Sequence, residues 1–129
     1  MHALIVDDST LMRKVIERAL RQADLDVTTV TEAANGQEAL DLLRLAALPD
    51  IILCDINMPA MDGLEFLEAR RAQKVAPGIP VVMISSKTNE QLVRRAILAG
   101  ARGFLCKPFT AEQVKARIVP LLLLASGVS

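Results

Sequence analysis

Three aspartates, one serine and one lysine are the side chains of this 129-residue chain that could do chemistry together. Asp7, Asp8, Asp55, Ser85 and Lys107 each follow closely on a short apolar run. Taken singly, each is an ordinary residue of the turn after a strand, and the first two also suit the start of a helix. Their chemistry therefore depends on whether the fold brings them together.

Three carboxylates in one place would repel one another, and the pKa of at least one should rise unless a cation binds. Oxygen ligands suit Mg²⁺ better than Zn²⁺, for which a set of His and Cys ligands is lacking. A divalent ion beside the Lys107 ammonium suits a phosphoryl group, whose charge lies on its equatorial oxygens. Asp55 could then be the nucleophile that forms an aspartyl phosphate.

Five short apolar segments are expected to position these residues as strands. Residues 3–6, 51–54 and 81–84 are continuous apolar runs typical of buried strands, and the third strand is expected to continue to Asp55. Residues 27–30 are rich in β-branched side chains, and residues 103–106 complete the set. A proline cannot continue a central ladder, so Pro59 predicts that the third strand stops near Asn57. Asp55 is thereby placed at the carboxyl end of a buried strand.

Helical spacing of apolar residues follows each strand and predicts five helices. The first, running to about Ala23, carries an apolar stripe of Leu11, Met12, Val15, Ile16, Ala19 and Leu20. Asn35-Gly36 is predicted as a turn ahead of the second helix, and Met61-Asp62-Gly63 as the turn into the third.

The last two helices carry terminal signals. Thr88 with Gln91 and Thr110 with Gln113 each fit a capping box at the start of a helix. Gly100 is expected just beyond the end of the fourth helix, where glycine is favoured.

Five strand–helix units with short connections predict one α/β domain over residues 1–129. The pattern implies a parallel sheet, doubly wound, with helices on both faces and right-handed crossovers. The carboxyl ends of parallel strands share one edge, where open α/β sheets place their ligands. We therefore expect the three carboxylates, Ser85 and Lys107 to meet there.

The composition excludes several function classes. Lys plus Arg and Asp plus Glu are 15 each, so no net charge favours nucleic acid or an anionic membrane. Aromatic residues make up 2% of the chain, too few for base stacking. The apolar run at residues 119–125 is far shorter than the ~20 residues of a membrane span, and the first residues lack a signal-peptide pattern. We expect a soluble, cytoplasmic protein without direct contact with nucleic acid or membrane.

Four motifs in this order resemble the receiver domain of two-component response regulators, over roughly residues 2 to 119. They are residues 6–9 (Val-Asp-Asp-Ser), residues 54–63 (Cys-Asp-Ile-Asn-Met-Pro-Ala-Met-Asp-Gly), residues 84–86 (Ile-Ser-Ser) and residues 107–109 (Lys-Pro-Phe). Each is weak alone, and the combination is specific. The chain is most similar to single-domain, CheY-like chemotaxis regulators, which implies the flavodoxin-like strand order 2-1-3-4-5.

The resemblance implies a role for each site residue. Asp55 would accept a phosphoryl group from a histidine kinase or a small phosphodonor. Asp8, Asp55 and the backbone carbonyl of Asn57 would hold Mg²⁺, with Asp7 joining through water. Lys107 would pair with the phosphoryl oxygens.

Two further residues would form the switch. Ser85 would move to hydrogen-bond a phosphoryl oxygen; the family often has threonine there, and either hydroxyl can donate. Phe104 stands where the family has a switching aromatic, often tyrosine, so the ring is kept and its hydroxyl is lost. The surface formed by the fourth helix, fifth strand and fifth helix would then bind a downstream partner or a second copy of the chain.

Three other readings stay open. A receiver domain cut from a longer regulator would have the same chemistry. A second alternative is an interaction module that kept the fold without phosphorylation; such a module would not need the three aspartates and Lys107. A haloacid-dehalogenase-type phosphatase would place its nucleophile after the first strand with a second aspartate two residues on, whereas Asn57 stands two residues beyond Asp55. We expect a signalling protein, and an enzyme only toward its own phosphorylation and dephosphorylation.

Three structural expectations complete the sequence analysis. Cys54 and Cys106 lie two strands apart, ~9.6 Å, which exceeds the ~7 Å Cα limit for a disulfide. The resemblance implies a cis bond between Lys107 and Pro108. Pro120 disfavours a straight fifth helix, so we expect either a kink there or leucines left on the outer face. Because residues 121–124 are four leucines that span more than one helical turn, at least one should be exposed.

Overall fold

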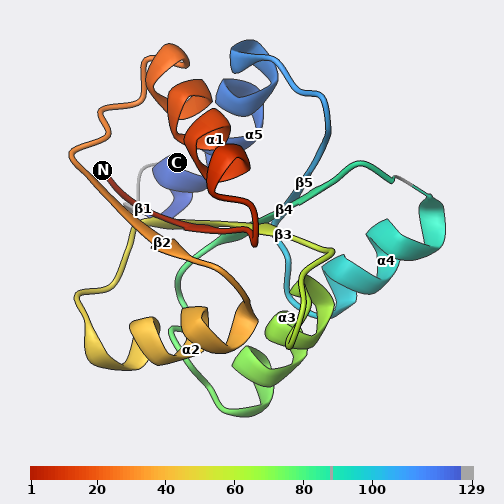
Figure 1. The fold of residues 1–129 in the computed structure, drawn as a ribbon. Coiled ribbons are helices and arrows are strands. Elements are labelled where there is room, and N and C mark those ends of the chain that lie inside the picture. The colour runs from red at the N-terminus through yellow and green to blue at the C-terminus, as the bar shows by residue number, and fades with distance from the viewer. Residues whose placement is uncertain (88, 126–129) are drawn as a thin grey trace.

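The computed structural model, which describes residues 1–87 and 89–125, contains one five-stranded parallel sheet in the order β2-β1-β3-β4-β5 (Figure 1). The strands are β1 His2–Val6, β2 Thr29–Ala33, β3 Ile51–Asp55, β4 Val81–Ser85 and β5 Gly103–Cys106. The helices are α1 Thr10–Gln22, α2 Gly36–Leu45, α3 Gly63–Ala72, α4 Glu90–Leu98 and α5 Ala111–Ala125. The predicted fold class and strand order are confirmed.

Helices cover both faces of the sheet, α1 and α5 on one face and α2, α3 and α4 on the other (Figure 1). Alternate residues of each central strand enter two separate cores. On β3, Ile51 and Leu53 pack toward α1 and α5, whereas Ile52 and Cys54 pack toward the other three helices. Burial on both faces explains why β1, β3 and β4 are continuous apolar runs in the sequence.

The second strand begins two residues later than predicted and ends three residues later. Val27 is buried, but its N–H bonds the Leu25 carbonyl within a turn, and β2 pairs with β1 only from Thr29 onward. As an edge strand, β2 carries polar residues, and Glu32 pairs beside Ile5. The predicted run 27–30 therefore overlaps only the first two residues of β2, Thr29 and Val30.

Two predictions at helix starts are wrong in detail. Asn35 is the N-cap of α2, accepting the Glu38 N–H at 2.9 Å, so Asn35-Gly36 opens the helix and does not form a separate turn. On α1, Leu11 and Val15 are exposed, because the buried stripe is centred on Ile16 and Leu20 and the two residues lie beside it.

Two of the three terminal signals predicted for the last two helices are confirmed. The Thr110–Gln113 capping box is present, with N–H···O distances of 2.9 and 3.1 Å. Gly100 has φ 113° directly after the α4 C-cap, a backbone conformation that favours glycine, as predicted. The predicted box at Thr88 falls outside the described residues, and the N-cap of α4 is Asn89.

The remaining structural expectations are confirmed. No disulfide joins Cys54 to Cys106, and the Lys107–Pro108 bond is cis. Helix α5 continues through Pro120; Leu121 and Leu122 pack against the core, and Leu123 and Leu124 are exposed. Within the described ranges, no helix is long and apolar enough to cross a membrane.

Candidate functional site

The end of β1 delivers two aspartates in different environments. Asp7 is buried and accepts the Ser9 N–H at 2.9 Å through Oδ1, whereas Asp8 is exposed. Ser9 in turn caps α1 by accepting the Met12 N–H. Since Ser9 is the capping residue, Asp8 has no capping role and Asp7 supports the cap only through its bond to Ser9.

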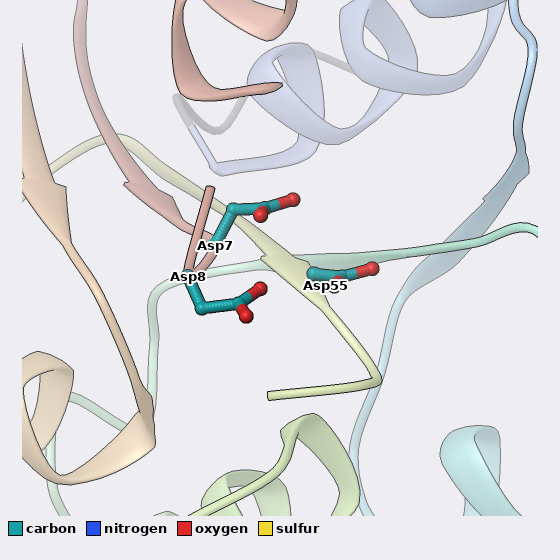
Figure 2. Close-up of side chains that lie close together, drawn as sticks. All are labelled: Asp7, Asp8 and Asp55. Atoms are coloured by element: carbon teal, nitrogen blue, oxygen red, sulfur yellow. The ribbon is translucent and has the colours of Figure 1, made fainter. Parts of the chain in front are cut away.

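Asp55 ends β3, whose neighbours in the sheet are β1 and β4. One carboxylate oxygen from each of Asp7, Asp8 and Asp55 lies within 4.8 Å of the other two. Figure 2 shows the three side chains gathered at the ends of β1 and β3. The predicted convergence of the acidic residues is thus present in the fold.

Lys107 reaches the acidic cluster from the end of β5. Its Nζ lies 3.1 Å from Asp55 Oδ1 and 3.5 Å from Asp7 Oδ2, and its side chain is 19% exposed. The Lys107 N–H also donates to the Ser85 carbonyl at 2.8 Å, which fixes the backbone where β4 and β5 end. The ammonium therefore faces two carboxylates from a backbone held by the sheet.

Burial raises the pKa of Asp55 above its usual value, and the nearby charge of Asp7 acts in the same direction. The hydrogen bond and the charge of Lys107 oppose the rise in pKa. Lys107 therefore only partly offsets the cost of burying the ionised Asp55 carboxylate beside Asp7, and binding of a further cation would favour the ionised form.

The donor set fits a small divalent cation. Asp7 Oδ2 is buried and has no hydrogen-bond partner among the described residues, and its 3.5 Å separation from Lys107 Nζ is an ion-pair distance only. Buried oxygens without a partner are costly, and a metal ion between the three carboxylates would supply the missing partner. All the available ligands are oxygens, which is the preference of Mg²⁺.

The other predicted site residues surround this cluster. Ser85 is fully buried at the end of β4, next to β3, and its Oγ accepts the Lys87 N–H at 3.0 Å. Asn57 is exposed in the loop after β3. Phe104 on β5 is half-buried and packs at the margin of the core under α2, α3 and α4.

Phe104 also lines a surface hollow of about 560 Å³ together with Val93 of α4, Lys107 and Arg117 of α5. The hollow therefore joins the lysine of the acidic site to the surface between α4, β5 and α5. Phe104 and Lys107 therefore line the same hollow.

Two contacts near the site were not predicted from the sequence, those of Gly63 and Arg13. A side-chain carbon at Gly63 would stand 2.4 Å from the Asp55 carbonyl oxygen, so only glycine fits there. Arg13 donates to the Asp7 carbonyl through Nη1 and pairs with Glu32 at 2.9 Å. Gly63 was predicted as a turn residue and belongs to the motif of residues 54–63, but the local sequence does not predict its contact with the Asp55 carbonyl. Nor does it indicate that Arg13 contacts the Asp7 carbonyl.

Comparison with known proteins gives consistent relatives. The family model for the response regulator receiver domain matches residues 3–119. The chain is 36% identical to the chemotaxis protein CheY of Pseudomonas aeruginosa over 127 residues, covering 98% of this chain and 100% of that protein. It is 35% identical to a CheY homologue of Campylobacter jejuni, covering 98% and 96% of the two chains.

Solved structures agree in fold. The Vibrio cholerae chemotaxis protein CheY4 superposes with a TM-score of 0.78 at 34% identity, covering 93% of this chain and 97% of that one. A response regulator from Chloroflexus aurantiacus gives a TM-score of 0.82 at 30% identity, with coverage of 94% and 96%.

Proposed function

The chain belongs to the response regulator receiver domain family, and we propose that Asp55 is the residue that accepts the phosphoryl group in this two-component phosphoacceptor switch. The observation that carries the assignment is the place of Asp55 between the acidic cluster and Lys107, at 3.1 Å from the ammonium. Asp7 is a poorer acceptor, because its Oδ1 is hydrogen-bonded to Ser9 and its Oδ2 is buried.

The proposed donor is a phosphohistidine of a sensor histidine kinase, or a small phosphodonor. An Asp55 carboxylate oxygen attacks phosphorus and the bond from phosphorus to the donor breaks. With phosphohistidine this is a phosphorus–nitrogen bond and the leaving imidazole takes up a proton; with acetyl phosphate it is a phosphorus–oxygen bond and acetate leaves. The product is an aspartyl phosphate. The Lys107 ammonium meets the negative oxygens of the incoming group, at a position already held by the backbone bond to Ser85.

Asp8, Asp55 and the backbone carbonyl of Asn57 would hold Mg²⁺, with Asp7 joining through water. When bound, the ion would neutralise charge on the oxygens of the transferred group. The residues of this chain position the reaction: Asp7 and Asp55 are set by neighbouring strands, and the three carboxylates lie within 4.8 Å of one another.

The proposed output surface is the face of α4, β5 and α5. The Ser85 hydroxyl, which now accepts the Lys87 N–H, would turn away and donate to a phosphoryl oxygen. The Phe104 ring would then move into the space that the Ser85 side chain leaves. Support comes from the hollow that joins Lys107, Phe104 and Val93. A downstream protein or a second copy of the chain would bind there.

We further propose a chemotaxis-type role, since relatives covering nearly the whole chain carry chemotaxis names. The 129 residues would act as a single receiver domain whose only catalysis is its own phosphorylation and dephosphorylation. The alternative is a receiver within a longer regulator; a Treponema pallidum protein-glutamate methylesterase is 42% identical over 118 residues, and the match covers only 28% of its length. Family membership argues against the phosphatase reading.

Acetyl phosphate with Mg²⁺ tests the assignment of Asp55. Intact mass measurement should find one added phosphoryl group on the native chain and none on Asp55→Asn. Asp24→Asn is the matched control, because Asp24 is exposed in a left-handed turn that asparagine tolerates. Equal labelling of Asp55→Asn and the native chain would show that another residue is the acceptor.

A further inference from the structure

A basic cavity lies at the edge of the sheet opposite the acidic site. Its volume is about 220 Å³, and its cationic lining residues are Arg70, Arg71, Lys74 and Arg102. The first three belong to the carboxyl end of α3 and the loop after it, and Arg102 directly precedes β5. The cavity is therefore built where β4 and β5 begin, whereas Asp55 and Lys107 stand where strands end.

The positive charge of this cavity is not balanced by the protein. Within residues 1–87 and 89–125, none of the four cationic side chains lies within 4.0 Å of a carboxylate. The residues that complete the lining are apolar or glycine, among them Ile79 and Gly100. Four like charges around one hollow repel each other, and an anion would relieve that repulsion.

Arg70 is the deepest of the four, at 7% exposure. Its Nη2 donates to the carbonyls of Ala76 and Ile79, but its Nε is buried and has no hydrogen-bond partner in the part of the chain that the structure describes. Burial lowers the pKa of Arg70, and the charge of Arg102 lowers it further. A buried guanidinium with an unused N–H is costly unless an acceptor arrives.

Favourable contact between cations and helix carboxyl ends accounts for part of this arrangement. Arg71 donates to the Leu98 carbonyl at the end of α4, and Arg70 donates to the two loop carbonyls. No side-chain hydrogen bond or ion pair holds Lys74 or Arg102 in the described part of the chain, and both are exposed. Two of the four cations are thus left for a ligand.

We propose that this cavity binds a phosphate dianion, either free or carried as the monoester of a small molecule. Arginine forks and a lysine are the residues that recognise phosphate oxygens, and a dianion matches the excess positive charge better than a monovalent carboxylate. The volume of 220 Å³ exceeds the ~30 Å³ share of a water molecule but lies below the range of about 300–1,000 Å³ for drug-sized ligands. A cavity of this size, between one water molecule and a drug-sized ligand, suits inorganic phosphate or a small phosphorylated metabolite.

Titration with inorganic phosphate, followed by amide NMR in EDTA at constant ionic strength, tests the proposal. EDTA removes divalent ions, so the acidic site cannot contribute, and the result is independent of whether Asp55 is the phosphoacceptor. Shifts should concentrate at residues 74–80 and 99–102. Glycerol 3-phosphate and AMP are titrated in parallel; tighter binding of either than of inorganic phosphate identifies a carried monoester, and equal or weaker binding identifies the free ion.

The test variant is Lys74→Gln with Arg102→Gln, which leaves the buried Arg70 in place. It should weaken phosphate binding about tenfold or more. The control is Arg18→Gln with Lys115→Gln, two exposed residues of α1 and α5 with the same total change in charge; it should change binding less than about twofold. Equal weakening in both variants, or equal shifts with sodium chloride, would overturn the proposal.

Discussion

The Asp55 carbonyl oxygen and the α-carbon of Gly63 approach so closely that an added Cβ would stand 2.4 Å from the oxygen. The same carbon would lie 2.8 Å from the Met83 side chain on the neighbouring strand. The start of α3 is therefore packed directly against the backbone of the proposed phosphoacceptor. The Gly63 N–H also donates to the Ile56 carbonyl at 2.8 Å, which ties the loop after β3 back to the helix.

We expect Gly63→Ala to destabilise the protein by about 1–3 kcal/mol or more, because the methyl group cannot be placed without moving backbone. Magnesium affinity should fall as well, since Asp55 and the Asn57 carbonyl lie on the displaced loop. Urea unfolding and a magnesium titration measure the two effects. Gly78→Ala is the control, because a Cβ at Gly78 meets no atom of the described residues within 4 Å; equal losses in both variants would contradict the packing argument.

Lys107→Ala should separate metal binding from signalling. The ammonium lies 3.1 Å from Asp55 and 3.5 Å from Asp7, so its removal takes away a competing positive charge and leaves the carboxylates in place. We expect magnesium affinity to be kept or raised, while phosphorylation no longer shifts the amide signals of α4. Lys115→Ala, an exposed change on α5, should respond as the native chain does. A normal α4 response in Lys107→Ala would remove the lysine from the switch.

The pKa of Asp55 predicts how stability depends on pH in the absence of divalent ions. Burial raises this pKa in the folded state. At a pH below the unfolded value, ~3.9, the group is protonated in both states; as the pH rises through the folded pKa, the folded state is penalised and stability is lost.

Asp55→Asn removes that penalty, so in EDTA the variant should gain stability over the native chain as the pH rises from about 4 to 7. Urea unfolding at a series of pH values gives the difference directly. The Asp24→Asn variant is the matched control, because it removes one carboxylate at an exposed position. A constant difference between Asp55→Asn and the native chain would mean that the pKa of Asp55 is the same in the folded and unfolded states.

Self-association through the output surface is tested on α5. Leu123 is 48% exposed near the end of that helix. If phosphorylation favours a dimer through α4, β5 and α5, a phosphoryl mimic should raise the mass of the native chain by light scattering and fail to do so for Leu123→Lys. Leu45→Lys is the control, since Leu45 is 87% exposed at the end of α2. Identical masses in all samples would leave a different protein as the partner.

The sequence alone determined the central strands and the edge at which chemistry gathers. Residues 51–55 and 81–84 could be assigned because a strand buried on both faces must be apolar throughout, and Asp55 and Ser85 end such runs. Parallel strands then place Asp7, Asp55 and Lys107 at one edge with no further information.

Tertiary structure decided the features that depend on neighbours distant in sequence. β2 starts at Thr29 because an edge strand takes its register from β1 and not from its own apolar residues. Gly63 is required by the Asp55 carbonyl, and the unpartnered Nε of Arg70 is visible only once α3, the loop before β4 and Arg102 are packed together. Local sequence determines which segments can be buried; contacts between segments determine which atoms are left without a partner and so available to a ligand.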